Sequence, residues 1–279
     1  MSVKFGPAGN ADSFYKNGGK KTVDNIDVIA DLGLDAYEYQ CGNGVRTGED
    51  AAKVIAEKAK KRNIAVSVHS PYFISLSSVE EEKRDGSIKY ILDSVRLVKW
   101  LGGNRVVVHS GSCAKLTREQ ALEYAKMTVV KALKTLDECG FDDVHLCLET
   151  MGKINQLGTL EEVIELCKLD ERLLPTVDFG HLNARILGGI NYKEILDKIE
   201  NGLGRYRAEN FHAHFSKIEY SNGGEKRHLT FEDNIYGPDF EPLMELLFKR
   251  NLSPTIICES SGTQTEDALA MKNYYNSLK

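Results

Sequence analysis

The sequence has no long apolar run, no Cys-x-x-Cys pair and no excess of basic residues, and each absence argues against a class of protein. No stretch approaches the roughly 18–20 consecutive apolar residues that a membrane helix needs. The formal net charge is −5, whereas domains that simply coat nucleic acid are usually basic. This charge is still compatible with a local basic rim around an acidic pocket. We therefore expect a protein that does not act in a membrane.

The six cysteines are scattered, and none forms a Cys-x-x-Cys pair. No secretory segment opens the chain. Both observations predict free thiols in a cytoplasmic protein. Low-complexity tracts and linker-like stretches are missing too, so we expect one domain over residues 1–279. A single α/β barrel typically needs roughly 250 residues, which fits this length.

Short apolar runs alternate with amphipathic stretches eight times along the chain. The predicted strands are Val3–Asn10, Ala36–Gly42, Ala65–Tyr72, Arg105–Gly111, Val144–Thr150, Leu174–His181, Asn210–Lys217 and Thr255–Ser261. Helical patterns lie between them, as in Ala51–Arg62 and Glu119–Cys139. Strands that alternate with helices of this length predict parallel β-α-β units. Eight such units predict a single-domain (β/α)₈ TIM barrel.

Side chains alternate between the two faces of each predicted strand. In Arg105–Gly111, for example, Val106 and Val108 share one face, while Val107 and His109 share the other. We expect the more apolar face to meet the helices. The polar residue at the end of each strand would then point into the barrel mouth, where this architecture places its chemistry.

Six predicted strands end with a side chain that can bind a metal ion. These residues are His69, His109, Glu149, Asp178, His212 and Glu259. His181 stands three residues after Asp178, His214 two residues after His212, and His228 in the loop after the seventh predicted strand. A mixture of imidazole and carboxylate suits zinc, manganese or iron better than calcium. Several carboxylates in one mouth would repel one another without a cation, so the sequence predicts a metal site.

Each of these residues also has a plainer interpretation. A lone histidine at a strand end is more often a hydrogen-bonded polar residue than a ligand. A lone Glu or Asp often caps a helix or pairs with a basic residue. The convergence favours the metal site, because five of the seven histidines lie on or just after the C-terminal half of a predicted strand. We interpret Cys147, Cys258 and His145 as structural.

Taken together, these motifs resemble the xylose-isomerase-like barrels, and within them the endonuclease IV family (AP endonuclease family 2) of abasic-site DNA repair enzymes. The resemblance is carried by the segments VHSPYFISL, VVVHSGS, LCLETMGKINQLG, TVDFGHLNA, FHAHFSK and IICESSG. Each segment is weak evidence alone. Their order and spacing along almost the full chain are fairly specific for the superfamily.

The resemblance implies a phosphodiesterase with two or three zinc ions, or with manganese in their place. Three ligand groups carry over by position: His69, His109 and Glu149; Glu149, Asp178, His212 and Glu259; and His181 with His228. Glu149 and Glu259 would also act in catalysis. Neighbouring ions would activate a water molecule and stabilise the attacking and leaving oxygens.

The resemblance also implies substrate contacts at the rim of the mouth. Tyr72 and Phe73 would wedge into a DNA duplex beside an extruded abasic nucleotide. Packing of these two rings at the rim is an equal alternative. Arg46 and Lys226 lie in segments that follow strands and would contact substrate phosphates.

One position departs from the family pattern. The family's third ion uses an Asp two residues before the loop histidine, but here Lys226 stands two residues before His228, with Glu225 one step earlier. A lysine would repel a metal ion. We therefore expect a weakened third site and an intact two-ion core. The alternative is that Glu225 moves in as the missing carboxylate.

A second hypothesis comes from the same superfamily. Its sugar isomerases and epimerases would use one manganese-like ion held by Glu149, Asp178, His212 and Glu259. The ion would polarise a hydroxy-ketone while two glutamates move protons. The expected substrate is thus abasic-site DNA or a small phosphate or sugar. A non-catalytic binding barrel is a third hypothesis, because barrels host many functions.

Overall fold

The computed structural model describes residues 3–279, so the first two residues of the expected domain lie outside the described residues. Eight parallel strands form one sheet in the spatial order β1-β10-β7-β6-β5-β4-β3-β2. Their bounds are β1 Lys4–Pro7, β2 Ala36–Gln40, β3 Ala65–His69, β4 Arg105–His109, β5 His145–Glu149, β6 Leu173–Asp178, β7 His212–Phe215 and β10 Thr255–Cys258. The predicted eight-stranded parallel architecture is confirmed.

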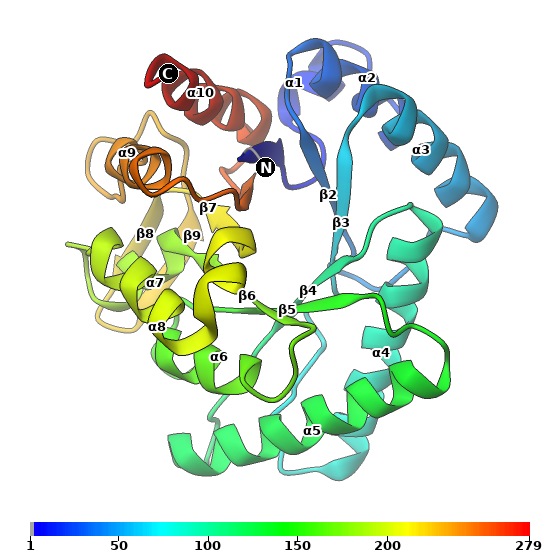
Figure 1. Cartoon of the computed structure of the whole chain (residues 1–279), viewed down its shortest axis with the longest axis vertical. Helices are drawn as coiled ribbons and strands as arrows, with labels where there is room; N and C mark the ends of the chain where they lie inside the picture. The colour runs from blue at the N-terminus through cyan, green and yellow to red at the C-terminus, as the bar shows by residue number, and fades with distance from the viewer. Residues whose placement is uncertain (1–2) are drawn as a thin grey trace.

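Backbone hydrogen bonds join the first and second strands and so close the sheet into a barrel. Asp35 N donates to Phe5 O at 2.8 Å, and Gly9 N donates to Glu38 O at 2.9 Å. Helices surround the ring of strands (Figure 1). The C-terminal helix α10 packs beside β1, which brings the two ends of the described chain to the same side of the barrel.

Ten helices are present in the described residues. They are α1 Asp12–Lys16, α2 Thr22–Asp31, α3 Glu49–Arg62, α4 Glu81–Trp100, α5 Arg118–Glu138, α6 Leu160–Cys167, α7 Phe179–Arg185, α8 Tyr192–Asn210, α9 Glu241–Arg250 and α10 Gln264–Ser277. Helices α5 and α6 each begin at a capping box, in which a threonine and a residue three positions later satisfy each other's backbone N–H groups. These caps fix where the chain leaves the mouth of the barrel.

The alternation along the strands separates two apolar regions. Val106, Val108 and Leu146 belong to the main core between the strands and the helices. Val107 and Cys147 face the lumen, where they form a small separate cluster with Leu174. The expectation that the more apolar face meets the helices is confirmed. The lumen side is left for polar residues above and below this small cluster.

All eight predicted strands run one to three residues past the C-terminal ends of the observed strands. Two differences affect the mouth of the barrel. The predicted strand Leu174–His181 is too long, because β6 ends at Asp178 and His181 lies in helix α7. The segment after the seventh strand is a hairpin rather than a loop, with β8 at Ile218–Ser221 and β9 at Gly224–His228. Both differences change how metal-binding side chains are presented.

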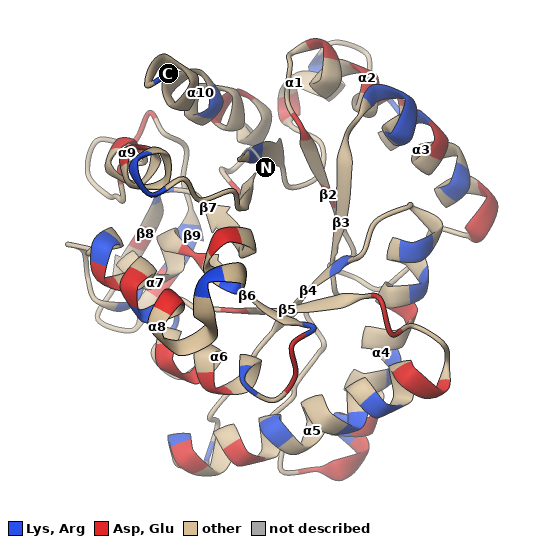
Figure 2. Cartoon of the chain, in the orientation of Figure 1, with Lys and Arg blue, Asp and Glu red and all other residues tan. Residues whose placement is uncertain are grey.

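Charged residues of both signs are mixed along the outer helices (Figure 2). All six cysteines are free, and Cys147 and Cys258 are fully buried. Within residues 3–279, no helix combines the length and the apolarity that crossing a membrane would require.

Candidate metal centre

A cavity of about 1080 Å³ opens at the C-terminal mouth of the barrel. Its wall contains metal-binding side chains from strands, helix α7 and the hairpin, namely His69, His109, Glu149, His181, Glu225, His228 and Glu259. The expected convergence at the ends of the strands is therefore what the structure shows. Whether these side chains hold ions is still a prediction.

Glu149, the last residue of β5, is fully buried at the centre of this cluster. Its Oε2 atom lies 3.4 Å from His69 Nε2 and 3.2 Å from His109 Nε2. Its Oε1 atom faces the other way, 3.1 Å from His214 Nδ1. Each oxygen thus serves a different group of ligand atoms, which is the arrangement that a carboxylate bridging two ions requires.

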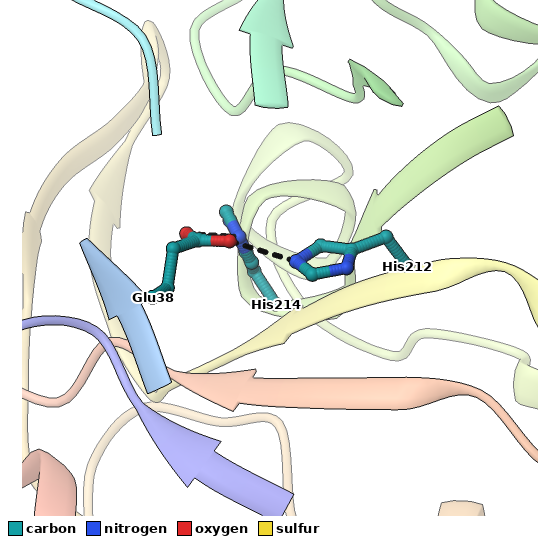
Figure 3. A group of neighbouring side chains, drawn as sticks. All are labelled: Glu38, His212 and His214. Carbon is teal, nitrogen blue, oxygen red and sulfur yellow. Dashed lines mark hydrogen bonds and ion pairs between the residues drawn. The ribbon is translucent and has the colours of Figure 1, made fainter. Parts of the chain in front are cut away.

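The second group contains His214 in place of His212, which the sequence analysis had assigned. Its members are Glu149, Asp178, His214 and Glu259. Both histidines point into the lumen from β7, but strands rise about 3.3 Å per residue, so His212 lies one layer, roughly 6.6 Å, deeper. His212 Nε2 instead binds Glu38 Oε2 at 2.8 Å, below the mouth (Figure 3).

Asp178 connects the second group to helix α7. Its Oδ1 atom caps the helix by accepting a hydrogen bond from His181 N at 2.6 Å. Its Oδ2 atom is buried and has no hydrogen-bond partner among the described residues. The cap fixes the direction of the carboxylate, and the second oxygen is left free to bind an ion.

The third group joins helix α7 to the hairpin and consists of His181, Glu225 and His228. His181 Nε2 lies 3.4 Å from Glu225 Oε2, and the two histidine rings are 5.5 Å apart. The position of Glu225 was the alternative in the sequence analysis. The group therefore contains a carboxylate after all, and its donor atoms can meet at one ion.

A β-bulge explains why Glu225 replaces the expected acid. In the hairpin Glu219 pairs with Arg227 and the next pair is Tyr220 with Glu225, so Lys226 is an extra residue in β9. The bulge lets Lys226 and Arg227 both bind Glu219 on one side. Glu225 is thereby turned toward the other side, as bulges near functional sites commonly re-aim side chains. The structure thus places Glu225, the alternative of the sequence analysis, beside the two histidines, and the strength of the third site stays a prediction.

Two glycines let the tip of the hairpin pack closely on the loop after β5. Glu225 N donates to Gly152 O at 3.2 Å, and Ile154 N donates to Gly223 O at 3.1 Å. A Cβ atom at Gly224 would lie 2.2 Å from Gly152 O. This contact fixes the position of Glu225 relative to the barrel.

The substitution Gly152→Ala should therefore dislodge Glu225. The added Cβ atom would lie 2.6 Å from Glu225 Cβ and 2.8 Å from its Oε2, so the hairpin must shift. We expect one metal ion fewer per chain in elemental analysis, although every ligand is still present. Gly48→Ala, where a Cβ meets nothing within 4 Å, is the control. An unchanged ion count in Gly152→Ala would contradict this role of the contact.

Backbone and hydroxyl groups hold three of the histidine rings from behind. The Nδ1 atoms of His69, His181 and His228 lie 2.9 Å from Ser70 O, 3.0 Å from Thr150 O and 2.8 Å from Ser216 Oγ, respectively. Such partners fix the tautomer and the orientation of metal-binding histidines. In each ring the Nε2 atom is left to face the ligand cluster.

The separations between donor atoms fit divalent ions. Two ligands at about 2.1 Å from a tetrahedral ion lie roughly 3.4 Å apart. The distances from His69 Nε2 to Glu149 Oε2 and from His181 Nε2 to Glu225 Oε2 are both 3.4 Å. Glu149 Oε2, like Asp178 Oδ2, is buried without a hydrogen-bond partner among the described residues. The residues present therefore fit a cluster of zinc-like ions.

The buried histidines and carboxylates of the cluster shift one another's pKa values. Burial alone would lower the pKa of His69, but Glu149 raises it to about 9. Burial likewise opposes the charge of His181, yet Asp178 and Glu225 raise its pKa to about 9. Burial favours the protonated form of Glu149, but His214 and His109 hold its pKa well below the usual range. Protons and metal ions should therefore compete for the same atoms.

This competition predicts that the stability of the folded protein depends on pH in opposite directions with and without bound metal. Histidines whose pKa is raised from 6.5 to about 9 stabilise the chelated protein below pH 6.5 and lose that contribution as the pH rises through 9. Zinc binds the deprotonated rings, so its stabilising effect should grow over the same range. Thermal unfolding of EDTA-treated and zinc-loaded protein at about pH 6.5, 7.5 and 8.5 measures both trends. If the unfolding temperatures of the two samples changed with pH in the same direction, the assignment of these histidines as zinc ligands would be contradicted.

The residues expected to contact substrate lie around this cavity. The side chains of Tyr72 and Phe73 are 61% and 51% exposed. The ring of Tyr72 lies 5.7 Å from that of His109, and Phe73 packs edge-on against Tyr90. Arg46 is exposed and lines the cavity. Lys226 lines it too, but its ammonium group pairs with Glu219.

Sequence comparison finds relatives over most of the chain. The family described as "Xylose isomerase-like TIM barrel" matches residues 26–274. An uncharacterized protein of Methanocaldococcus jannaschii is 34% identical over 253 residues, which cover 89% of this chain and 90% of that protein. A probable endonuclease 4 of Mycoplasma pneumoniae is 28% identical over 203 residues, which cover 71% of this chain and 68% of that protein.

Solved structures with the same fold include two kinds of enzyme. A D-tagatose 3-epimerase-like protein has a TM-score of 0.74 at 22% identity, with 99% of this chain and 98% of that chain covered. Endonuclease IV from Thermus thermophilus has a TM-score of 0.71 at 17% identity, with 99% of this chain and 100% of that chain covered. At these identities the likeness concerns the fold alone.

Proposed function

Because the chain belongs to the xylose isomerase-like TIM barrel family, we propose that its mouth cluster holds divalent ions and hydrolyses the phosphodiester at abasic sites in DNA. The family includes several activities, and the similarity to probable endonucleases 4 supports hydrolysis at abasic sites among them. The ions would be two or three zinc ions, with manganese as an alternative.

The observation that carries the proposal is the presence of three adjoining ligand groups around one cavity. Glu149 belongs to the first and second groups, and the ring of His181 in the third group adjoins it, with Nδ1 3.5 Å from Glu149 Oε1 and Nε2 turned toward Glu225. A scheme with one ion uses the second group alone. That scheme gives no role to His69 and His109, which face Glu149, or to Glu225 on the hairpin.

Bound divalent ions would supply Lewis acidity and lower the pKa of a water molecule at neutral pH. The protein's own residues would do the rest. Glu149 would offer one carboxylate oxygen to the first ligand group and the other to the second. Glu259 extends from the end of β10 into the cavity, where its carboxylate can orient a water molecule and accept its proton.

The rim supports a substrate larger than a single sugar. The cavity of about 1080 Å³ is slightly larger than the roughly 300–1,000 Å³ usual for small-molecule pockets. The adjacent rings of Tyr72 and Phe73 are both exposed, as side chains that insert between bases must be. Arg46 and Lys153 would meet phosphates from the cavity wall.

The alternative is a sugar isomerase or epimerase that uses one ion in the second group, Glu149, Asp178, His214 and Glu259. Glu149 and Glu259 would then exchange protons with a ketose. One sample decides between the two functions. Ions per chain are counted by elemental analysis, and the same protein is assayed on abasic duplex DNA and on a panel of ketoses. One ion with ketose turnover and no DNA cleavage would overturn the proposal.

Phe73→Ala should weaken binding to abasic duplex DNA without changing the metal content. The ring is 51% exposed and contacts Tyr90 at the rim, so its removal should leave the ligand cluster intact. We expect a loss of affinity of about 5- to 150-fold, since base–aromatic stacking is worth roughly 1–3 kcal/mol. Binding is measured by fluorescence anisotropy in a salt titration, because DNA affinity falls steeply with salt.

The matched control is Tyr206→Ala, which removes a 64% exposed ring on α8, close to where α8 leads into the start of β7. This variant should bind DNA like the wild type. Equal affinity of Phe73→Ala and the wild type would exclude the ring from DNA recognition.

A further inference from the structure

Glu38, on β2, is a fully buried carboxylate beneath the second ligand group. Its side chain reaches across the lumen to two histidines of β7 (Figure 3). Its Oε2 atom accepts hydrogen bonds from His212 Nε2 at 2.8 Å and Ser67 Oγ at 2.8 Å. Its Oε1 atom lies 3.0 Å from His214 Nε2 and 3.4 Å from Gln40 Nε2. The strands β2 and β7 are not neighbours in the sheet.

The imidazole of His214 stands between Glu38 and the metal centre. Its Nδ1 atom faces the mouth, 3.1 Å from Glu149 Oε1 and 3.6 Å from Glu259 Oε2. Its Nε2 atom faces the lumen, where it makes no hydrogen bond with the described residues apart from this close contact with Glu38. The direction of the ring therefore depends on the carboxylate behind it.

We propose that Glu38 is a positioning residue for the metal centre, which holds His214 so that Nε2 carries the proton and Nδ1 binds the ion. The inference rests on the proposed function only in requiring that the second group binds a divalent ion. Carboxylates behind metal-binding histidines fix the tautomer and make the ring a stronger ligand. His69, His181 and His228 have neutral oxygen atoms in this place, so His214 differs from them in having a charged partner.

Glu38 could instead be a ligand, because Glu38, His212 and His214 lie close enough to surround an ion. The distances argue against this. Two ligands of one tetrahedral ion are roughly 3.4 Å apart, whereas His212 Nε2 and Glu38 Oε2 are 2.8 Å apart, a hydrogen-bond distance. Ser67 already donates to the same oxygen.

The arrangement also places a negative charge under the ion without using a coordination position. His212 and Ser67 keep the carboxylate hydrogen-bonded inside the lumen, where an unpaired charge would be costly. The negative charge of Glu38 would influence the ion only through its contact with His214. His212 thus supports Glu38, which explains its place one layer below the ligands.

The first test is Glu38→Gln, which keeps the size of the side chain and removes its charge. Zinc affinity is measured by competition with a chromophoric chelator. We expect one binding constant to weaken by about 10–100-fold while the number of ions at saturation stays the same. Ser67→Ala removes one hydrogen bond to Glu38 but leaves its charge, and should alter zinc affinity far less.

Two results would overturn the proposal. Unchanged zinc affinity in Glu38→Gln would show that His214 needs no charged partner. Loss of one ion, with the other sites unaffected, would make Glu38 a ligand. If the wild type itself binds no divalent ion, the proposed function fails as well. If the wild type binds ions and only the Glu38→Gln result is negative, the proposed function stands.

A second measurement uses the wild type, in case Glu38→Gln does not fold. NMR spectra of zinc-loaded protein labelled with ¹⁵N-histidine report which ring nitrogen carries the proton. We expect His214 to be protonated at Nε2 and bound to zinc through Nδ1, the reverse of His69, His181 and His228. Binding of His214 through Nε2, or an Nε2 without a proton, would contradict the proposal.

Discussion

Glu149→Gln should release at least one metal ion and lower cleavage of abasic DNA by on the order of 10³-fold or more. The carboxylate faces His69 and His109 with one oxygen and His214 with the other, so its charge serves two ligand groups at once. A metal ion contributes several kcal/mol to the transition state, and each 1.4 kcal/mol or so is about a factor of ten in rate. Elemental analysis and single-turnover kinetics measure the two effects.

Glu165→Gln is the matched control, because Glu165 is a half-exposed glutamate on α6 whose carboxylate pairs with Lys168. It should keep the full ion content and the full rate. Thermal unfolding of both chelated variants shows whether the fold is intact. Full metal content together with normal cleavage in Glu149→Gln would remove this residue from the centre of the site.

Glu225→Ala should remove one ion and leave the other two in place. Glu225 is the one carboxylate in the group with His181 and His228, and two neutral rings alone make a poor site for a divalent ion. We expect cleavage to fall on the order of 10²-fold, as when one preorganised electrostatic contact to the transition state is lost. Isothermal titration with zinc after chelation separates the weakest site from the others.

Lys226→Ala is the natural comparison, since Lys226 is the neighbouring residue but points to Glu219. This variant should keep all the ions that the wild type holds. The interpretation would be wrong if Glu225→Ala retained the wild-type ion count, or if Lys226→Ala lost an ion.

The sequence contains enough to predict the barrel and most of the ligand cluster. The period-two alternation in segments such as Arg105–His109 identifies the lumen face, and parallel strands bring their C-terminal ends to one edge. His69, His109 and Glu149 follow from that rule, because each is the last residue of its strand.

The remaining ligands could not be identified from alternation, because alternation shows which face a residue is on but not how far along the barrel it lies. His212 and His214 share the lumen face of β7, and only the register with β6, where Asp178 is level with His214, shows which one reaches the mouth. Glu38 is also on a lumen face, two residues before the end of β2. The alternation of Tyr37, Glu38 and Tyr39 could have identified it as an acid turned into the barrel.

The bulge in β9 has a consequence for how such proteins are recognised from sequence. A pattern that requires an acid two residues before the histidine rejects this chain, since Lys226 stands two residues before His228. One inserted residue in a hairpin strand moves the acid to a spacing of three and still presents it on the same side. Glu225 and His228 therefore belong to one ligand group although three positions separate them along the chain. Relatives in which an acid stands three residues before this histidine would keep the ligand set while failing the motif.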